Sequence, residues 1–318
     1  MTAMPRFQGL KSLAISPPSL RDENRKTLRV VLPALLFALI ALAGAAGAQE
    51  PLRIVFIAYE NPDQLVENVE PVIDYLEGRL GGEVEHFAAT DYAAVVEALR
   101  HGSADVGFMG PLQYVMARRQ AGAYPILGEI YNGSATYVAR IFVRKDSGTK
   151  TLADLAGKTI AFVDPISSSG YMYPLDAFKS AGLIRTRADA DTFFKRVYFA
   201  GGDEQAIRAV LNRFVDAAGV GQFAFGLLRG GERDQVVHVA ESRPIPSHCV
   251  VVRKDLDAGR VDALRDALLA LNEGPNHGLL EHLYGVDGYV RVDASTYAEV
   301  EDIARQYDFI PASGSPAP

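Results

Sequence analysis

Alternating β-type and helix-type segments are the feature that most limits the folds open to this chain. Leu52–Tyr59 (LRIVFIAY) is a continuous apolar run with β-branched residues, as expected of a parallel strand buried on both faces. The next segment, from Asn61, carries apolar residues at helical spacing, and two more strand–helix pairs follow by residue 122. This β-α-β-α-β-α series predicts an open α/β domain with a mostly parallel sheet.

The N-terminal segment has the pattern of an export signal. The basic stretch RKTLR (residues 25–29) precedes an apolar run from Val30 to Ala43, and AGA (residues 46–48) follows as a small-x-small cleavage site. The apolar run is shorter than the ~20 residues needed to span a bilayer. We therefore expect residues 1–48 to be a signal peptide with an N-terminal extension, cleaved near Ala48-Gln49, and a periplasmic protein. An uncleaved membrane anchor is the alternative.

The chain length limits the number of domains, and the net charge limits the classes of partner. The 318 residues are 48% hydrophobic, which suggests two domains with large cores. The formal net charge of −7 becomes −11 without residues 1–48, because that segment holds six basic and two acidic residues. No strongly basic segment follows the N-terminus, so we expect no nucleic-acid partner. The single cysteine, Cys249, excludes an intramolecular disulfide and a multi-cysteine metal site, and we expect no metal and no cofactor.

A short repeat suggests how the two domains are connected. FVRKDSG (Phe142–Gly148) and VVRKDLD (Val251–Asp257) both end a β-rich run, and a separate β-α-β pattern lies between them. We interpret this as a second α/β domain inserted into the first, although coincidence is the alternative. The expected division is residues 49–140 and 252–310 for lobe I and 141–251 for lobe II, with a disordered tail at 311–318.

The segment DPISSSGYMYPL (Asp164–Leu175) places three serines between a predicted strand and a predicted helix. Ligands of open α/β sheets bind at the carboxyl ends of the strands, where a helix N-terminus offers unpaired N–H groups. Hydroxyl groups add neutral donors, so Ser167, Ser168 and Ser169 can hold an oxyanion without a lysine or arginine. The alternative is one helix cap and two solvated serines. A nucleophile elbow would need a glycine where Ile166 stands, so we expect no enzyme.

Four segments together resemble a known family. VDPISSSGYMYPLDAFKSAG resembles the D-P-x-S-[ST]-S-G segment of periplasmic binding proteins for phosphonate, phosphite and phosphate, and ADVGFMGPLQYVMA resembles their A-D-[VL]-x-x-x-G-P-x-x-Y segment. TLADLAGKTIAFVDP and RPIPSHCVVVRKDL match in the expected order, so the resemblance covers nearly all of the chain after the signal. It implies a two-lobed, type II α/β fold: two open, mostly parallel sheets joined by two crossover strands.

The resemblance also implies a function. A monomeric, exported binding protein would capture a small phosphorus oxyanion between its lobes and deliver it to the permease of an ABC transporter, without chemistry. The alternative is a sensing protein for an oxyanion or arsenite that signals to a membrane histidine kinase. The serine triplet with Gly170 would grip the oxyanion, Tyr114 would contact it from lobe I, and Tyr59 would be a further cleft aromatic. For both tyrosines the alternative is packing in the core or rim.

Two positions depart from the family pattern. Asp203 in FAGGDEQAI stands where the family often has a histidine, and His248 in IPSHC stands where it often has an acid. The two groups would then exchange sides of the cleft, with His248 as the donor; the alternative is that both only line the rim. An ionised Asp203 would repel a dianion, so we expect a ligand that carries a proton, is neutral or has a cationic group. Cys249 is a candidate soft ligand for arsenite, or simply a small buried residue.

Overall fold

The computed structural model of the protein describes residues 50–58 and 62–310. The expected signal peptide, Tyr59 and the expected tail lie outside these ranges. Within them, no helix combines the length and the apolar character required to cross a membrane.

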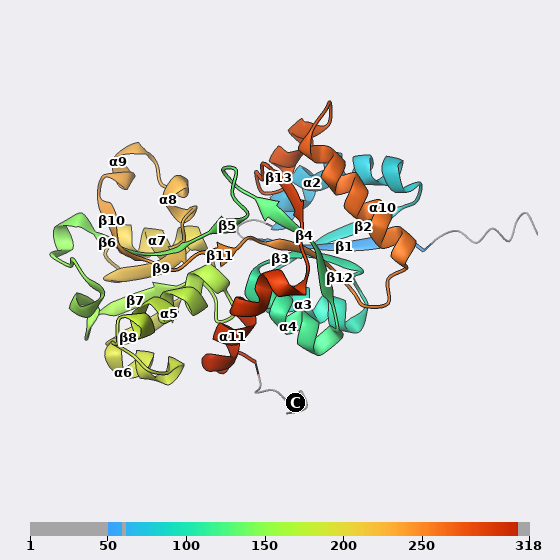
Figure 1. The fold of residues 1–318 in the computed structure, drawn as a ribbon. Helices are drawn as coiled ribbons and strands as arrows, with labels where there is room; N and C mark the ends of the chain where they lie inside the picture. Colours follow the sequence, from blue (N-terminus) through green and yellow to red (C-terminus); the bar gives the residue numbers. More distant parts are fainter. Residues whose placement is uncertain (1–49, 59–61, 311–318) are drawn as a thin grey trace, which may run out of the picture. The chain divides into compact units, whose positions relative to one another are not determined.

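The first sheet has six strands in the order β13-β4-β12-β3-β1-β2 (Figure 1). Its strands are β1 (Leu52–Ile57), β2 (Val84–Ala89), β3 (Val106–Met109), β4 (Tyr124–Ile130), β12 (Cys249–Val252) and β13 (Gly288–Arg291). Its helices are α2 (Pro62–Leu80), α3 (Tyr92–His101), α4 (Pro111–Ala121) and α10 (Ala258–Leu269). We call this sheet with its helices the first lobe.

Strand β1 is buried on both faces, as its apolar run predicts. In β1, Leu52, Ile54 and Phe56 join one hydrophobic cluster, whereas Val55 and Ile57 join the other, because successive side chains of a strand point to opposite faces. The helix starts also follow the sequence. Asp91 caps α3 by accepting a hydrogen bond from the Ala94 N–H at 2.8 Å, and α4 begins at Pro111.

The second sheet has five strands in the order β10-β6-β9-β7-β8. Its strands are β6 (Ala139–Arg144), β7 (Thr159–Phe162), β8 (Arg196–Phe199), β9 (Ala217–Gly221) and β10 (Val236–Glu241). Its helices are α5 (Tyr173–Ser180), α6 (Ala190–Phe193), α7 (Asp203–Leu211), α8 (Ala224–Leu227) and α9 (Gly230–Arg233). We call this sheet with its helices the second lobe.

Several short helical turns complete the two lobes. They are η1 (Lys145–Ser147), η2 (Leu152–Leu155), η4 (Arg187–Asp189), η5 (Ala270–Asn272), η6 (His277–His282) and η7 (Ala294–Tyr297), all 3₁₀ in type, and η3 (Ser168–Met172), a turn of π-helix. The π-turn leads directly into α5.

Two short strands carry the chain between the lobes and pair with each other. β5 (Thr136–Tyr137) and β11 (Ile245–Pro246) form an antiparallel two-stranded sheet (Figure 1). The chain enters β6 after the first crossing and β12 after the second. The repeated Val-Arg-Lys-Asp sequence begins at the end of each of these two strands. The expected α/β fold with two crossover strands is confirmed.

Each sheet is mixed, however, and not mostly parallel as expected. β1, β2 and β3 pair in parallel, as do β7, β8 and β9, but β12 runs antiparallel to β3 and β6 runs antiparallel to β9. The register gives the reason. β12 begins opposite Met109, the last residue of β3, and β6 begins opposite Gly221, the last residue of β9. A strand arriving from the other lobe enters at the carboxyl end of its neighbour and must therefore run against it.

Helix α11 (Ala298–Gln306) and the residues after it contact both lobes. α11 packs on α4 of the first lobe, while the Tyr307 hydroxyl donates to Asp176 of α5 at 3.2 Å. By strand pairing, β12 belongs to the first sheet, although the expected boundary at residue 251 cuts through it. We therefore propose that the lobes divide within residues 137–139 and 246–249, a few residues before the expected boundaries.

Candidate ligand-binding site

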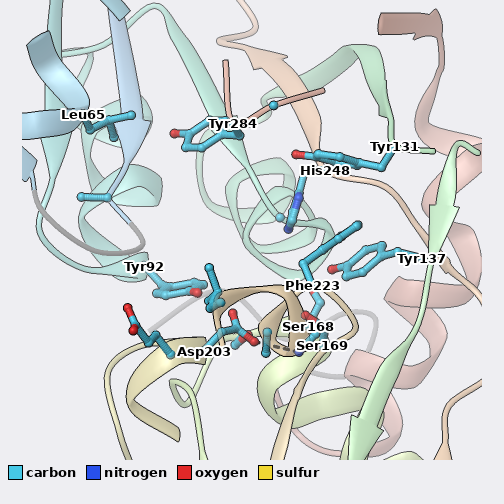
Figure 2. Close-up of a pocket in the computed structure, with 18 of the residues that line it drawn as sticks. Leu65, Tyr92, Tyr131, Tyr137, Ser168, Ser169, Asp203, Phe223, His248 and Tyr284 are labelled. Carbon is cyan, nitrogen blue, oxygen red and sulfur yellow. Dashed lines mark hydrogen bonds between the residues drawn. The ribbon is translucent and has the colours of Figure 1, made fainter. Parts of the chain in front are cut away.

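A cavity of about 490 Å³ is lined by residues of both lobes (Figure 2). Its size lies within the range of small-molecule sites. The first lobe contributes mainly the segments around Leu65, Tyr92, Gln113, Tyr131 and Tyr284, and the second contributes Ser167–Ser169, Asp203 and Phe223. Tyr137 and His248 line it from the crossings between the lobes.

The three serines form the end of the cavity that we call the serine cup, Ser167–Ser169. They follow β7 and begin the π-turn η3, and all three line the cavity. Ser167 caps the turn, since its Oγ accepts a hydrogen bond from the Gly170 N–H at 3.0 Å. Gly170 itself has a packing role: a Cβ there would lie 2.3 Å from the Val163 side chain. The glycine allows the helix to start close against β7, so it shapes the cup from behind.

Ser168 links the cup to the first lobe. Its Oγ accepts a hydrogen bond from the Leu112 N–H, in the first turn of α4, at 2.9 Å. Ser167 and Ser168 therefore each use a lone pair on a backbone N–H, which fixes the position of their side chains in the cup. The cup thus offers hydroxyl groups beside a helix start, which suits an oxyanion.

Two further polar groups, which were not assigned from the sequence, are placed to contact a ligand. Gln113 lines the cavity at 1% exposure, and within the described part of the chain neither its Oε1 nor its Nε2 has a hydrogen-bond partner. The Tyr137 hydroxyl is also buried, and it interacts with the Ser169 hydroxyl at the cup. Buried polar groups are normally hydrogen-bonded, so the Gln113 amide is placed to bind a ligand, with the Tyr137 hydroxyl beside the cup.

Tyr114, expected to contact the ligand, is turned away from the cavity. It is fully buried, its ring meets that of Tyr297 edge-on at 5.0 Å, and it does not line the cavity. Successive residues of a helix point about 100° apart, so the neighbouring Gln113 faces the cup in its place. Burial also raises the pKa of Tyr114 to about 12. The helix turn given by the motif therefore lies at the cup, but in this structure Gln113 and not Tyr114 lines the cavity.

Asp203 lies beside the serine cup at the start of α7. Its Oδ1 accepts a hydrogen bond from the Gly221 N–H at 2.7 Å. A Cβ built on Gly221 would lie 3.1 Å from the Ser169 Oγ and 3.5 Å from the Asp203 Oδ1, so the hydroxyl and the carboxyl flank one point. Burial raises the pKa of Asp203, against the opposing effects of the Gly221 N–H and of His248. An oxyanion in the cup therefore needs a proton between itself and Asp203.

Aromatic side chains line much of the cavity beside the cup, and we call Tyr131, Tyr137, Phe223, Tyr284 and His248 the aromatic end, of which Tyr137 lies next to Ser169 (Figure 2). The Phe223 ring lies 4.9 Å from the Tyr131 ring and 5.9 Å from the Tyr137 ring, and Tyr137 lies 5.2 Å from His248. These rings come from residues distant in the sequence, so no local motif could have identified them. Burial raises the pKa values of Tyr131, Tyr137 and Tyr284, which keeps all three hydroxyls neutral.

A buried carboxylate, Glu129, lies behind the aromatic end. It is 1% exposed, it accepts a hydrogen bond from the Tyr131 hydroxyl at 2.7 Å, and its Oε2 lies 3.6 Å from the His248 Nδ1. His248 therefore lies at the expected cleft position, between Glu129 of the first lobe and the cavity.

Cys249 is not a cavity residue, which removes the structural basis for a sulfur ligand. It is fully buried in β12, and its thiol donates to the Met109 carbonyl with a 3.8 Å separation. Burial raises the pKa of the thiol, so the reactive thiolate is disfavoured. Within residues 50–58 and 62–310, no group of three or more His, Cys, Asp or Glu side chains is placed to hold a metal ion.

Comparison with known proteins decides the family. The sequence pattern of the periplasmic substrate-binding proteins of phosphonate ABC transporters matches residues 54–297. The chain belongs to this family. It is 32% identical over 229 residues to the phosphate-import protein PhnD of Mycolicibacterium smegmatis, covering 70% of this chain and 69% of that protein. It is 26% identical over 272 residues to the phosphonates-binding periplasmic protein of Escherichia coli, covering 82% and 79%.

Other relatives agree on the fold. The binding component of a phosphonate transporter from Pseudomonas aeruginosa superposes with a TM-score of 0.71 at 22% identity, covering 80% of this chain and 86% of that one. The tetrathionate sensor histidine kinase TtrS of Salmonella typhimurium is 26% identical over 212 residues, which are 63% of this chain but only 34% of the kinase. The chain is therefore a substrate-binding protein by family, with the expected two-lobed type II fold.

Proposed function

We propose that this protein captures a phosphorus oxyanion (a phosphonate, phosphite or phosphate) in the serine cup and delivers it to the permease of an ABC transporter. The observation that carries the proposal is the serine cup itself: three serines at a helix start, facing a cavity between two lobes. Membership of a family of transporter binding proteins supports the same role. The relatives named for phosphate and phosphonates support the ligand class.

We infer capture without chemistry. The cup holds donors, but the described residues around it do not form a nucleophile–base pair: the Ser167 and Ser168 oxygens accept backbone N–H bonds, and His248 pairs with Glu129 at the aromatic end. The protein would act as an exported monomer, released near Ala48-Gln49, whose bound form is recognised by the permease. A product assay with each candidate phosphonate checks this, and turnover would contradict it.

Specific residues have distinct roles in the proposal. The Ser169 hydroxyl, the Gln113 amide and the Tyr137 hydroxyl donate to the oxyanion, while Ser167, Ser168 and Gly170 hold the geometry of the cup. Thermal unfolding with phosphate, phosphite, methylphosphonate, 2-aminoethylphosphonate, arsenate and sulfate tests the ligand class. A ligand at 100 times its Kd stabilises the folded protein by about 2.7 kcal/mol. That corresponds to a shift of several degrees, at roughly 2–4 °C per kcal/mol.

A second candidate is a periplasmic sensor that presents the same kind of ligand to a membrane histidine kinase. It is favoured by the similarity to part of TtrS, in which the matched segment is about a third of the kinase. Both candidates use the same fold and cavity. Genes for a permease and an ATPase beside this one would support transport, and genes for a kinase and a response regulator would support sensing. Arsenite is not proposed as the sensed ligand, because Cys249 is sealed in β12.

A further inference from the structure

The aromatic end of the cavity is larger than a bare oxyanion requires and has its own chemistry. We propose that it binds a fully alkylated ammonium group, so that the ligand is a zwitterion with a phosphorus oxyanion in the serine cup and a quaternary ammonium against the rings. This inference rests on the proposed function for the oxyanion, and it adds the chemical class of the rest of the ligand. A cavity of about 490 Å³ has room for both groups.

The charges of the cavity favour a cation. Three acids, Asp203, Glu204 and Asp287, line it, and its described lining includes no lysine or arginine, although Glu204 is paired with Arg208 just outside the lining. Glu129 adds a fourth carboxylate just behind Tyr131, and its Oε2 lies 3.6 Å from the His248 Nδ1. A cleft lined by one sign of charge concentrates the opposite sign. A ligand with only negative charge would bind against this field, whereas a zwitterion uses it.

The rings provide the surface that an alkylated cation prefers. Tyr131 follows β4, Phe223 follows β9 and Tyr284 follows η6, so three separate segments bring aromatic side chains to one end of the cavity (Figure 2). Aromatic faces attract cations through their quadrupole, and cages of such rings recognise quaternary ammonium groups. Glu129 behind the rings increases this attraction.

The hydrogen bonds at this end favour an alkylated ammonium over a primary one. A primary ammonium has three N–H donors that need acceptors. Of the carboxylates at this end, Glu129 does not line the cavity, and Asp287 accepts from the Gly133 N–H at 2.9 Å while keeping further acceptor positions. The Tyr284 hydroxyl donates to the Ile57 carbonyl at 2.9 Å. A trimethylammonium group has no N–H, so it gains from the charge and the ring faces without needing new acceptors.

The test compares two ligands of the same shape that differ by one charge. These are 2-(trimethylammonio)ethylphosphonate and its neutral carbon isostere, 3,3-dimethylbutylphosphonate. Calorimetric titration of the purified protein should give a Kd at least 10-fold lower for the cation, which is about 1.4 kcal/mol. 2-Aminoethylphosphonate should fall between them. The proposal is overturned if the isostere binds as tightly as the cation, or if the primary amine binds more tightly than the trimethylated ligand.

Two variants assign the effect to the aromatic end. Phe223→Leu removes a ring face and should reduce the preference for the cation over the isostere severalfold. The matched control is Phe214→Leu, because Phe214 is 78% exposed and does not line the cavity. An unchanged preference in Phe223→Leu would contradict the assignment to these rings.

Methylphosphonate separates failure of this inference from failure of the proposed function. It can occupy the cup but has no group for the aromatic end. If methylphosphonate binds while the cation shows no advantage over its isostere, the quaternary-ammonium inference is wrong and the oxyanion function stands. If methylphosphonate and all the larger ligands fail to bind, the proposed function fails first.

Discussion

Replacing Asp203 by asparagine should improve the binding of a simple dianion. The Asp203 Oδ1 and the Ser169 Oγ flank one point, at 3.5 Å and 3.1 Å from it. The two oxygens are therefore less than about 7 Å apart, and we take about 6 Å as the distance from the carboxylate to an oxyanion bonded to Ser169. At an effective dielectric constant of about 20, like charges at that separation repel by roughly 2–3 kcal/mol. Asp203→Asn removes this repulsion, which is larger still for a double charge, and should lower the Kd of methylphosphonate dianion by about 30-fold or more.

The effect of Asp203 on ligand affinity should depend on pH, because only the ionised carboxylate repels a dianion. Burial raises the pKa of Asp203, so this group contributes stability at pH values below its ordinary pKa, and the contribution is lost as pH rises through the raised pKa. The same ionisation weakens dianion binding. The titratable groups that interact with Asp203 are Tyr92, Tyr137 and His248. In wild-type protein, the affinity for methylphosphonate should therefore fall with rising pH more steeply than in Asp203→Asn.

Calorimetric titration in two buffers of different ionisation enthalpy measures the accompanying proton uptake. Binding to the wild-type protein should take up more protons than binding to the variant, since the ligand's own protonation is common to both. Asp234→Asn is the matched control, because Asp234 is exposed in the same lobe and does not line the cavity. The reasoning fails if Asp203→Asn weakens methylphosphonate binding, or if the two proteins show the same pH dependence.

Three other predictions concern packing and access. Gly170→Ala forces a Cβ against Val163, and overpacking of about 1–3 kcal/mol should lower the Tm by several degrees. Gly226→Ala is the control, because the space around Gly226 is open and its Tm should not change. Equal Tm values for the two variants would contradict the packing role of Gly170. Gln113→Leu should raise the methylphosphonate Kd about 10-fold or more, through loss of a donor to a charged group, and an unchanged Kd would argue against its role. Cys249 should resist a thiol reagent in the native protein and react after denaturation; fast native labelling would refute its burial.

Much of the fold could be predicted because local signals and tertiary structure agree. The apolar run of β1, the Asp91 cap and Pro111 at the start of α4 each specify their element through neighbouring residues alone. The direction of β12 and β6 could not be predicted this way. It depends on the side from which the chain enters a sheet, which is a property of the whole path between the lobes.

The site was predictable where one segment forms it and not where several do. The serine cup is a single strand-to-helix junction, so its position followed from the sequence. The choice between Gln113 and Tyr114 depends on the rotation of α4 against the second lobe, which a motif does not encode. The aromatic end required residues 131, 223 and 284 to meet, and only the tertiary structure brings them together.

The most direct test of the central claim is a calorimetric titration of phosphorus oxyanions into the wild-type protein and Ser169→Ala. Ser169 is the useful position, because Ser167 and Ser168 also hold backbone N–H groups whose loss would disturb the fold. Ser180→Ala, an exposed serine at the end of α5, is the control. We predict saturable binding of at least one phosphorus oxyanion, with a Kd about 10-fold or more higher in Ser169→Ala and unchanged in the control. Binding that is indifferent to Ser169→Ala, or no binding of any phosphorus oxyanion by folded wild-type protein, would contradict the serine cup as the oxyanion site.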